Sequence, residues 1–243
     1  MIRQELVARQ LDERLAAHFE VGRRLRVLDI GLGEGTQALR LARAGHQVTG
    51  LESDPALLDL VRGALEDEPE GIRERCRVMA GTGQDTGVHF LPGTFDVVLC
   101  HGPLTSARDP ESTLAGLARV LDSGGLLSVV IPNVTARAMG PGLAGDWTAA
   151  QAALTEPGDE ERWLRRETLE KLLSRIGAPL ERWYGVDVFS RERADAPAAD
   201  PAHPLDERLL ATEERAGRQS PYRDIAALVH LFGVRQTRGA AAE

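Results

Sequence analysis

Two glycines and two carboxylates near the start of the chain have the spacing of a nucleotide-type binding loop. The segment RVLDIGLGEGTQALRLARAG, residues 26–45, passes from an apolar run through Gly31 and Gly33 into a helical pattern. Glycine lets the backbone turn sharply and lets a ligand approach the free amides at a helix N-terminus. Asp29 precedes the turn, and Glu52 ends the next apolar run, where a carboxylate can accept the hydroxyls of a ribose. These residues predict a site for a phosphate- or ribose-bearing ligand.

The glycine turn departs from the dinucleotide-binding fingerprint G-x-G-x-x-G. Counting from Gly31, Thr36 stands where the third glycine belongs, and an extra glycine, Gly35, precedes it. The third glycine of the fingerprint permits close helix–strand packing beside a pyrophosphate. No G-K-[S/T] of a Walker loop follows, and we find no catalytic Tyr/Lys or His/Asp arrangement of a nicotinamide oxidoreductase. The turn therefore favours a ligand without a pyrophosphate.

The pattern D-x-G-x-G-x-G, followed by an acid at the end of the next expected strand, resembles motif I and its sequel in class I S-adenosylmethionine-dependent methyltransferases. The resemblance implies that Asp29 lies near the methionine amino group of the donor and that Glu52 binds its ribose. The donor-binding loop then comprises Gly31, Leu32 and Gly33. S-adenosylmethionine is the expected cofactor and S-adenosylhomocysteine the expected product.

Two later segments extend this resemblance. GTGQD, residues 81–85, follows the third expected strand and matches the adenine-side loop, which implies cofactor contacts by Gly83, Gln84 and Asp85. His101 directly follows the fourth expected strand and falls beside the methyl donor, as a cofactor-binding and catalytic candidate. A hydroxyl or amine acceptor needs a general base, and an ionised carboxylate does not. For a carboxylate, we expect His101 to orient the substrate or the donor.

The similarity to one methyltransferase family covers most of the chain. The bacterial tRNA 5-carboxymethoxyuridine methyltransferases, which methyl-esterify a wobble-uridine carboxylate, open with a helix whose arginine reaches the donor, and Arg3 falls on that position. Similar segments are RVLDIGLGEGTQALRLARAGHQV (26–48), FDVVLCHGPL (95–104), GGLLSVVIPN (124–133), GLAGDW (142–147) and RQSPYRDIAALVH (218–230). From the cap and the late segment, Trp147, Arg218 and Tyr222 are the candidate substrate residues, and Arg3 or Arg218 can pair with a negatively charged acceptor.

Two departures from that family concern the acceptor. TEPGDEERWLRR, residues 155–166, begins acidic where the family has a lysine-rich stretch, and HGPLTSARDP, residues 101–110, contains no aromatic residue. Basic density is what holds an anticodon stem. The sequence therefore favours O-methylation, at a carboxylate or a hydroxyl, of a small-molecule acceptor. Two alternatives stay open: methyl esterification of a 5-carboxymethoxyuridine-type wobble base in tRNA, and an S-adenosylmethionine-binding partner that is not catalytic.

Alternating strand and helix patterns predict the elements that position these residues on an α/β fold. Strands are expected at 24–30, 46–52, 75–81, 94–100, 124–132, 180–190 and 227–235, and helices at 3–20, 36–44, 54–66, 110–122, 166–176 and 205–217. The expected fold is Rossmann-like: a seven-stranded, mostly parallel sheet with helices on both faces. We expect a single methyltransferase domain, 1–243, with a core at about 22–132 and 166–236 and an inserted cap at about 133–165. Residues 191–204, rich in alanine and proline, are expected to form a loop.

Composition limits the setting in which the protein acts. The 243 residues include 29 Lys and Arg and 37 Asp and Glu, a net charge of −8, which disfavours binding driven by phosphate contacts. No signal peptide and no run of ~18 apolar residues is visible. Cys76 and Cys100 lie in apolar segments and are expected to be reduced and buried, and no Cys/His spacing indicates a metal site. We expect a cytoplasmic protein without membrane partners, with a small-molecule acceptor or tRNA as its partner, and of open oligomeric state.

Overall fold

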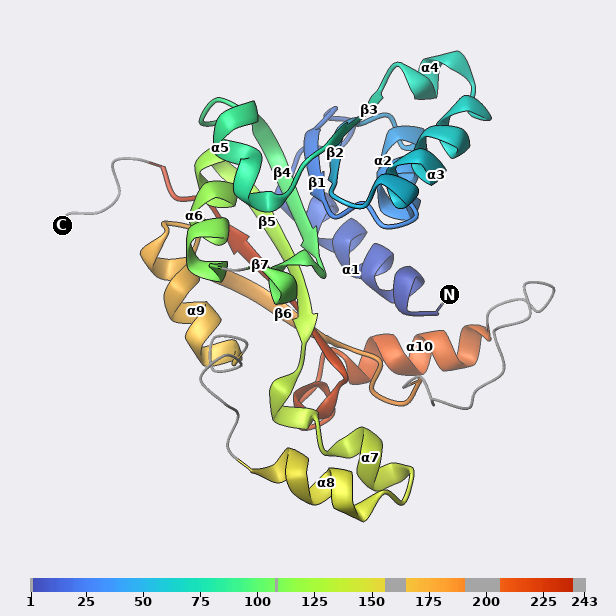
Figure 1. The fold of residues 1–243 in the computed structure, drawn as a ribbon, viewed down its shortest axis with the longest axis vertical. Helices are drawn as coiled ribbons and strands as arrows, with labels where there is room; N and C mark the ends of the chain where they lie inside the picture. The colour runs from blue at the N-terminus through green and yellow to red at the C-terminus, as the bar shows by residue number, and fades with distance from the viewer. Residues whose placement is uncertain (1, 108, 156–164, 191–205, 238–243) are drawn as a thin grey trace. The chain divides into compact units, whose positions relative to one another are not determined.

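The computed structural model of the chain describes residues 2–107, 109–155, 165–190 and 206–237. Within them, seven strands form one sheet of order β3-β2-β1-β4-β5-β7-β6 (Figure 1). The strands are β1 (Arg26–Ile30), β2 (Gln47–Glu52), β3 (Cys76–Ala80), β4 (Phe95–His101), β5 (Leu121–Pro132), β6 (Leu180–Val186) and β7 (Leu228–Val234). The first five pair in parallel.

The seventh strand reverses direction. The N–H of Gly124 donates to the carbonyl of Arg235, and the N–H of Asn133 donates to that of Ala227. The partner number falls as the β5 number rises, which is the signature of an antiparallel pair. The sheet is therefore mixed but mostly parallel, and the predicted fold class is confirmed.

Helices alternate with the strands along the chain, as the sequence predicts. They are α1 (Ile2–His18), α2 (Thr36–Arg43), α3 (Pro55–Glu66), α4 (Glu70–Arg73), α5 (Thr86–His89), α6 (Pro110–Val120), α7 (Met139–Leu143), α8 (Trp147–Leu154), α9 (Arg166–Arg175) and α10 (Glu207–Ala216). Short 3₁₀ turns are η1 (Gly83–Asp85), η2 (Pro103–Ser106), η3 (Val134–Ala136) and η5 (Arg223–Ile225). The side chain of Asp54 accepts the N–H of Ala56 at the start of α3, which satisfies an amide without a partner inside the helix.

Contacts within the chain define two compact units. The first unit comprises the described residues of Met1–His18, Ile131–Leu169 and Trp183–Leu231. The second comprises those of Phe19–Val130, Glu170–Arg182 and Phe232–Glu243. These boundaries differ from the expected core and cap, and the single-domain organisation stays a prediction.

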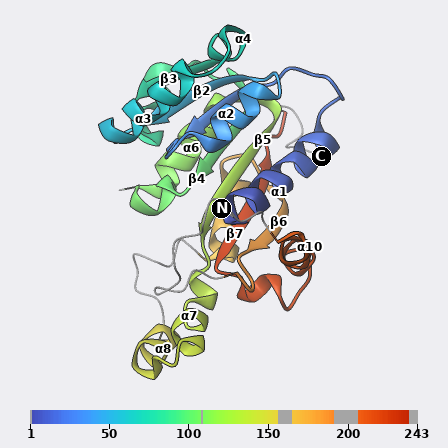
Figure 2. The same cartoon turned by 90° about the vertical axis from the view of Figure 1, so that its right-hand side faces the viewer.

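The second unit contains the parallel strands β3, β2, β1 and β4, which neighbour one another in this order. Figure 2 labels β2, β3 and β4 among them. Val27 on β1 pairs with Val48 on β2 and with Val97 on β4, and all three are buried. Strands buried on both faces are apolar along their whole length, which explains the near-continuous apolar runs of the sequence. Because parallel strands end at the same edge of a sheet, the turns that follow these strands gather at one place.

The first unit contains α1, α7, α8 and α10. The helices α1 and α10 contact each other, and Arg9 of α1 forms ion pairs with Glu5 and with Glu214 of α10. Gln10 and His230 are both buried, and their Oε1 and Nδ1 atoms lie 2.8 Å apart. These contacts hold the leading helix to the late segment of the chain within this unit.

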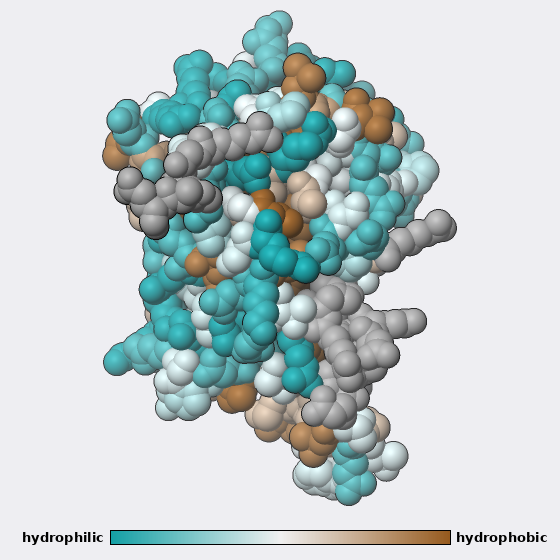
Figure 3. All heavy atoms as spheres, turned by 90° about the vertical axis from the view of Figure 1, so that its left-hand side faces the viewer, coloured by the Kyte–Doolittle hydropathy of each residue, from teal (hydrophilic) through white to brown (hydrophobic). Residues whose placement is uncertain are grey.

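The helices α7 and α8 also contact each other within the first unit. They carry three largely exposed apolar side chains, Leu143, Trp147 and Leu154. Figure 3 shows a few hydrophobic spheres among paler ones at the lower end of the molecule. Among the helices of the described residues, none combines the length and apolar character that a membrane crossing requires.

The structure differs from the sequence prediction at particular boundaries. The strand predicted at 180–190 ends at Val186, because Asp187 has a φ of 60°, which no strand residue adopts. The segment expected as a cap forms η3, α7 and α8 over its described residues. The helix α4 was not predicted, since four residues are too few to show a helical period. The expected loop at 191–204, and residues 156–164, lie outside the described residues.

Candidate cofactor and active site

The turn after β1 consists of glycines in the left-handed region. Gly31, Gly33 and Gly35 have φ angles of 72°, 55° and 76°. Such conformations strain any residue with a Cβ, which explains why glycine recurs here. The N–H of Gly31 donates to the carbonyl of Leu51 on β2 at 2.8 Å, which fixes the turn to the end of the sheet. A Cβ on Gly33 would meet no atom within 4 Å, so the space beside the turn is open.

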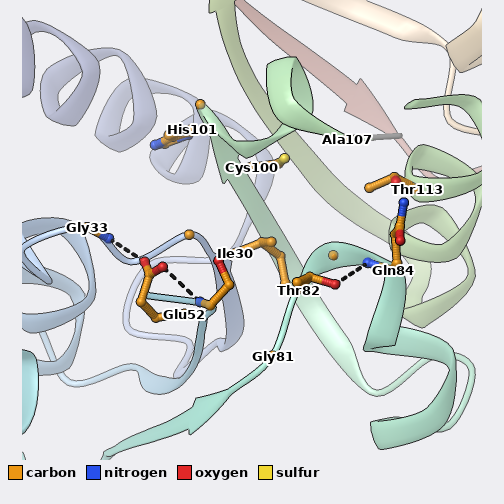
Figure 4. Close-up of a pocket in the computed structure, with 14 residues that line it drawn as sticks. Ile30, Gly33, Glu52, Gly81, Thr82, Gln84, Cys100, His101, Ala107 and Thr113 are labelled. Carbon is orange, nitrogen blue, oxygen red and sulfur yellow. Dashed lines mark hydrogen bonds between the residues drawn. The ribbon is translucent and has the colours of Figure 1, made fainter. Parts of the chain in front are cut away.

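Glu52 ends β2 and holds the glycine turn from the neighbouring strand. Its Oε2 accepts the N–H of Gly33 at 3.0 Å (Figure 4). Its Oε1 accepts those of Ser53 and Asp54 at 2.8 and 2.9 Å. A carboxylate has about four lone-pair positions, so Oε2 retains capacity for one more donor. Glu52 can therefore shape the turn and still accept a hydrogen bond from a ligand.

The turn after β3 is closed by a reciprocal cap. The hydroxyl of Thr82 accepts the N–H of Gln84 at 3.2 Å, and Asp85 accepts the backbone N–H of Thr82 at 2.7 Å and its hydroxyl at 2.8 Å. These bonds from Thr82 hold the pKa of Asp85 below its usual value. Gly83 is buried, and a Cβ there would lie 3.0 Å from the side chain of Thr113. Asp85 thus fixes the shape of the turn that presents Gly83 and Gln84.

His101 ends β4, and its Nε2 lies 2.9 Å from the hydroxyl oxygen of Ser128 on β5. Burial disfavours the charged imidazolium and the guanidinium of Arg40 repels it, which lowers the pKa of His101 to about 4. His101 is therefore neutral at pH 7. Burial also raises the pKa of the adjacent Cys100 thiol to about 12, so Cys100 offers no thiolate nucleophile.

These turns line one pocket of about 490 Å³ in the second unit. Cofactor and small-molecule pockets typically measure roughly 300–1,000 Å³. Of the residues predicted from sequence, it is lined by Gly31, Gly33, Glu52, Gly83, Gln84 and His101. Residues that the sequence analysis did not select also line it: Ile30, Ser53, Gly81, Thr82, Cys100, Gly102, Ala107 and Thr113. Figure 4 shows Glu52 and Gly33 on one side of this pocket and Gln84 and Thr113 on the other.

Three further predicted cofactor residues of the second unit, Asp29, Leu32 and Asp85, lie outside this lining. Asp29 is 4% exposed, and burial together with the charge of Glu52 raises its pKa to about 7. The side chain of Leu32 packs over Gly50 on β2, where the lack of a Cβ makes room for it. Leu32 therefore packs the turn against β2, and Asp29 is a buried carboxyl in the strand that precedes the turn.

The predicted arginines lie in the first unit, where each pairs with a carboxylate. The Nε of Arg3 donates to Oδ2 of Asp187 at 2.5 Å, and a terminal nitrogen of Arg218 donates to Glu13 at 2.6 Å. The predicted aromatic residues are in the same unit. Trp147 begins α8 and is 69% exposed, and the half-exposed ring of Tyr222 lies 6.5 Å from that of Phe189. Their roles with donor or acceptor stay predictions.

Sequence reasoning missed Ser128, the partner of His101. A signal existed, because Ser128 is the one polar side chain in LLSVVIP, residues 126–132, whose other members are apolar. A polar residue inside a buried strand needs a hydrogen-bond partner. Within the described parts of the chain, no group of three His, Cys, Asp or Glu side chains could hold a metal ion.

Comparisons with known proteins agree with this geometry. The family described as "Methyltransferase domain" matches residues 28–129. The tRNA 5-carboxymethoxyuridine methyltransferase of Escherichia coli O157:H7 is 31% identical over 237 residues, which cover 95% of this chain and 87% of that protein. The ubiquinone biosynthesis O-methyltransferase of Xanthomonas euvesicatoria pv. vesicatoria (strain 85-10) is 29% identical over 154 residues, or 60% of this chain and 62% of that one.

Solved structures show the same fold. Magnesium protoporphyrin IX methyltransferase from Synechocystis PCC 6803, solved with S-adenosylhomocysteine, matches with a TM-score of 0.61 at 16% identity, covering 97% of this chain and 84% of that one. Similarity over nearly the whole chain to a methyltransferase, with a matching domain family, goes beyond a shared fold. The chain belongs to the S-adenosylmethionine-dependent methyltransferases, in the family of the tRNA 5-carboxymethoxyuridine methyltransferases.

Proposed function

We propose that this methyltransferase transfers the methyl group of S-adenosylmethionine to a carboxylate oxygen and releases a methyl ester. The carrying observation is the placement of His101 in the pocket wall, where burial and Arg40 lower its pKa to about 4. A hydroxyl with a pKa of about 10 keeps its proton at neutral pH, and a histidine with a lowered pKa is a poor base for removing it. A carboxylate is already ionised at neutral pH and needs no base.

We propose that the pocket of the second unit holds the donor. The open space at Gly33 admits a ligand against the turn, and the remaining capacity of Glu52 Oε2 suits one ribose hydroxyl. Gly83 and Gln84 take the adenine side, as the family resemblance implies. The family resemblance assigns Asp29 to the methionine amino group, and that cation would favour the ionised form of Asp29, whose pKa is about 7.

The main task of the protein is to align the acceptor oxygen with the methyl group and the sulfur of the donor. Bound S-adenosylmethionine supplies a methyl group already activated by the sulfonium. The acceptor oxygen forms a bond to the methyl carbon while the bond between that carbon and sulfur breaks. The electron pair of the broken bond stays on sulfur. His101, neutral and fixed by Ser128, contacts and orients the acceptor, and the pocket walls exclude water.

Two acceptors share this chemistry. A small-molecule carboxylic acid fits the net charge of −8, because that charge gives no general attraction for a polyanion. The wobble carboxylate of 5-carboxymethoxyuridine in tRNA is the second candidate, favoured by the relative that matches 95% of the chain. We take the small-molecule acid as the primary acceptor and the tRNA nucleoside as its alternative.

The decisive experiment identifies the bond that forms. The purified protein is incubated with S-adenosylmethionine carrying a tritiated methyl group and, in separate arms, with a panel of small carboxylic acids and with tRNA that carries unmethylated 5-carboxymethoxyuridine. Mild alkali hydrolyses a methyl ester and releases labelled methanol, whereas a methyl ether survives. Alkali-labile label in either arm supports the carboxylate acceptor, and the labelled arm identifies its class. Alkali-stable label would overturn it.

A further inference from the structure

We propose that Ser128 is a positioning residue for methyl transfer, whose hydroxyl fixes the imidazole of His101 at the wall of the donor pocket. The inference rests on the proposed function in one respect: it takes orientation of the acceptor, not proton removal, as the task of His101. It assigns a role to a residue on β5 that does not itself line the pocket.

The placement of Ser128 follows from the register of two strands. Ser128 pairs with Leu99 on β4, and His101 lies two residues further along β4 opposite Val130. Ser128 is 0% exposed, and its neighbours Leu127 and Val129 are buried apolar residues. The His101–Ser128 bond at 2.9 Å is therefore made between a strand interior and a strand end within one unit.

The bond between Ser128 and His101 restrains the imidazole ring in addition to packing the strand. A hydroxyl buried in an apolar strand without a partner destabilises the fold, so valine or alanine would be the simpler choice for β5. A neutral imidazole can also rotate, and its two nitrogens differ, since one donates and the other accepts. A bond to Nε2 restrains the ring and makes Nε2 the nitrogen engaged with the strand. The imidazole of His101 then has one orientation in the pocket wall, which the alignment of an acceptor requires.

This role predicts a specific kinetic pattern. Ser128→Ala lowers kcat about tenfold, the value of one lost hydrogen bond, and leaves the Kd for S-adenosylmethionine within twofold of the wild-type value. Ser128→Thr retains the hydroxyl and restores most of kcat. Ser123→Ala, which removes an exposed hydroxyl from the same strand, is the matched control and leaves kcat unchanged.

A double-mutant cycle with His101 separates positioning from general support of the fold. If Ser128 acts through His101, Ser128→Ala has no further effect on kcat in a His101→Ala background. Losses that multiply in the double variant would overturn the proposal. Should Ser128→Ala not fold, the same cycle is run with Ser128→Cys, whose thiol is a weak hydrogen-bonding group of similar size.

A second readout needs no acceptor. In protein labelled with nitrogen-15 at histidine, the Nε2 resonance of His101 reports its hydrogen bond, and we expect it to move in Ser128→Ala and to stay in place in Ser123→Ala. An unmoved resonance would overturn the proposal. This test is separate from the alkali assay: alkali-stable product would refute the carboxylate acceptor and leave the His101–Ser128 bond to be judged by the resonance alone.

Discussion

Glu52 in the second unit and Glu213 in the first are bound in the same way. Each is buried, at 6% and 1% exposure, and each accepts three backbone N–H bonds. Glu52 holds Gly33, Ser53 and Asp54 after β1 and β2, and Glu213 of α10 holds residues 188–190 after β6, at 2.8, 2.7 and 2.5 Å. In both, Oε1 accepts two of the bonds and Oε2 accepts one.

The difference between the two lies in what surrounds the carboxylate. Glu52 lines the pocket of about 490 Å³, so its remaining capacity on Oε2 is open to a ligand. Glu213 is 1% exposed, and its bonds shape the turn after β6, where Asp187 adopts a φ of 60°. Both glutamates stabilise a turn. Of the two, only Glu52 also lines this pocket, where it can bind a ligand. Variants of the two should therefore separate stability from donor affinity.

The largest effect is expected for Glu213→Ala. The change leaves three buried amides without their acceptor, and we expect the free energy of unfolding to fall by on the order of 3 kcal/mol. Urea denaturation followed by circular dichroism measures it. Glu214→Ala is the matched control, because its ion pairs with Arg9 and Arg218 are partly exposed and contribute at most about 1 kcal/mol. Equal losses in the two variants would show that the three amide bonds of Glu213 contribute little.

A third buried carboxylate, Asp29, is expected to make stability depend on pH. Its pKa is about 7 in the folded protein and near 3.8 in the unfolded chain, so the folded state binds more protons between these values. Its contribution to stability is therefore full below about pH 4 and is lost as the pH rises to 7. In Asp29→Asn this pH-dependent change in the free energy of unfolding, which amounts to a few kcal/mol, is expected to disappear. Unfolding free energies of both proteins at pH 5 and pH 8 provide the measurement, and parallel pH dependences would contradict it.

Glu52→Ala is expected to weaken donor binding more than it weakens the fold. The variant loses the acceptor for a ribose hydroxyl and the hydrogen bond to Gly33. We expect the binding free energy of S-adenosylmethionine to weaken by about 1–3 kcal/mol, which raises its Kd roughly 5- to 150-fold. Isothermal titration calorimetry gives the Kd. Glu213→Ala serves as the opposite case, since its folded fraction should bind the donor normally. An unchanged Kd in Glu52→Ala would remove Glu52 from the donor site.

The two glutamates also show what sequence reasoning could reach. The positions of Gly33 and Glu52 were predictable because positive φ angles demand glycine, and because the parallel strands β1 and β2 end at the same edge of the sheet. Glu213 and Ser128 were not selected, since their partners lie 23–25 and 27 residues away and are brought close by packing alone. The positions of the seven strands and of most long helices followed from apolar periodicity, whereas their order in the sheet was not predicted. The left-handed Asp187, which ends β6 early, carries no such signal.

The lowered pKa of His101 likewise depends on packing that the sequence does not display. Sequence reasoning placed His101 beside the donor and left open whether it acts as a base. Burial and Arg40 decide its charge, since they hold its pKa at about 4. We expect kcat measured between pH 5.5 and 8 to show no ionisation of His101, because the ring is neutral over that whole range. A kcat that rises about tenfold with a midpoint near pH 6.5, and loses this rise in His101→Ala, would identify a titrating base and favour a hydroxyl acceptor.

The smallest effect on stability is expected for Trp147→Ala in the first unit. Trp147 is 69% exposed at the start of α8, so truncation should change the free energy of unfolding by no more than about 0.5 kcal/mol. Leu154→Ala is its control, because Leu154 is 76% exposed at the other end of the same helix. If Trp147 contacts the acceptor, its truncation raises the KM for the acceptor and leaves the Kd for S-adenosylmethionine unchanged, whereas Leu154→Ala changes neither. A KM that stays constant in both variants would remove Trp147 from the substrate residues and leave an exposed tryptophan of α8 without a role in this reaction.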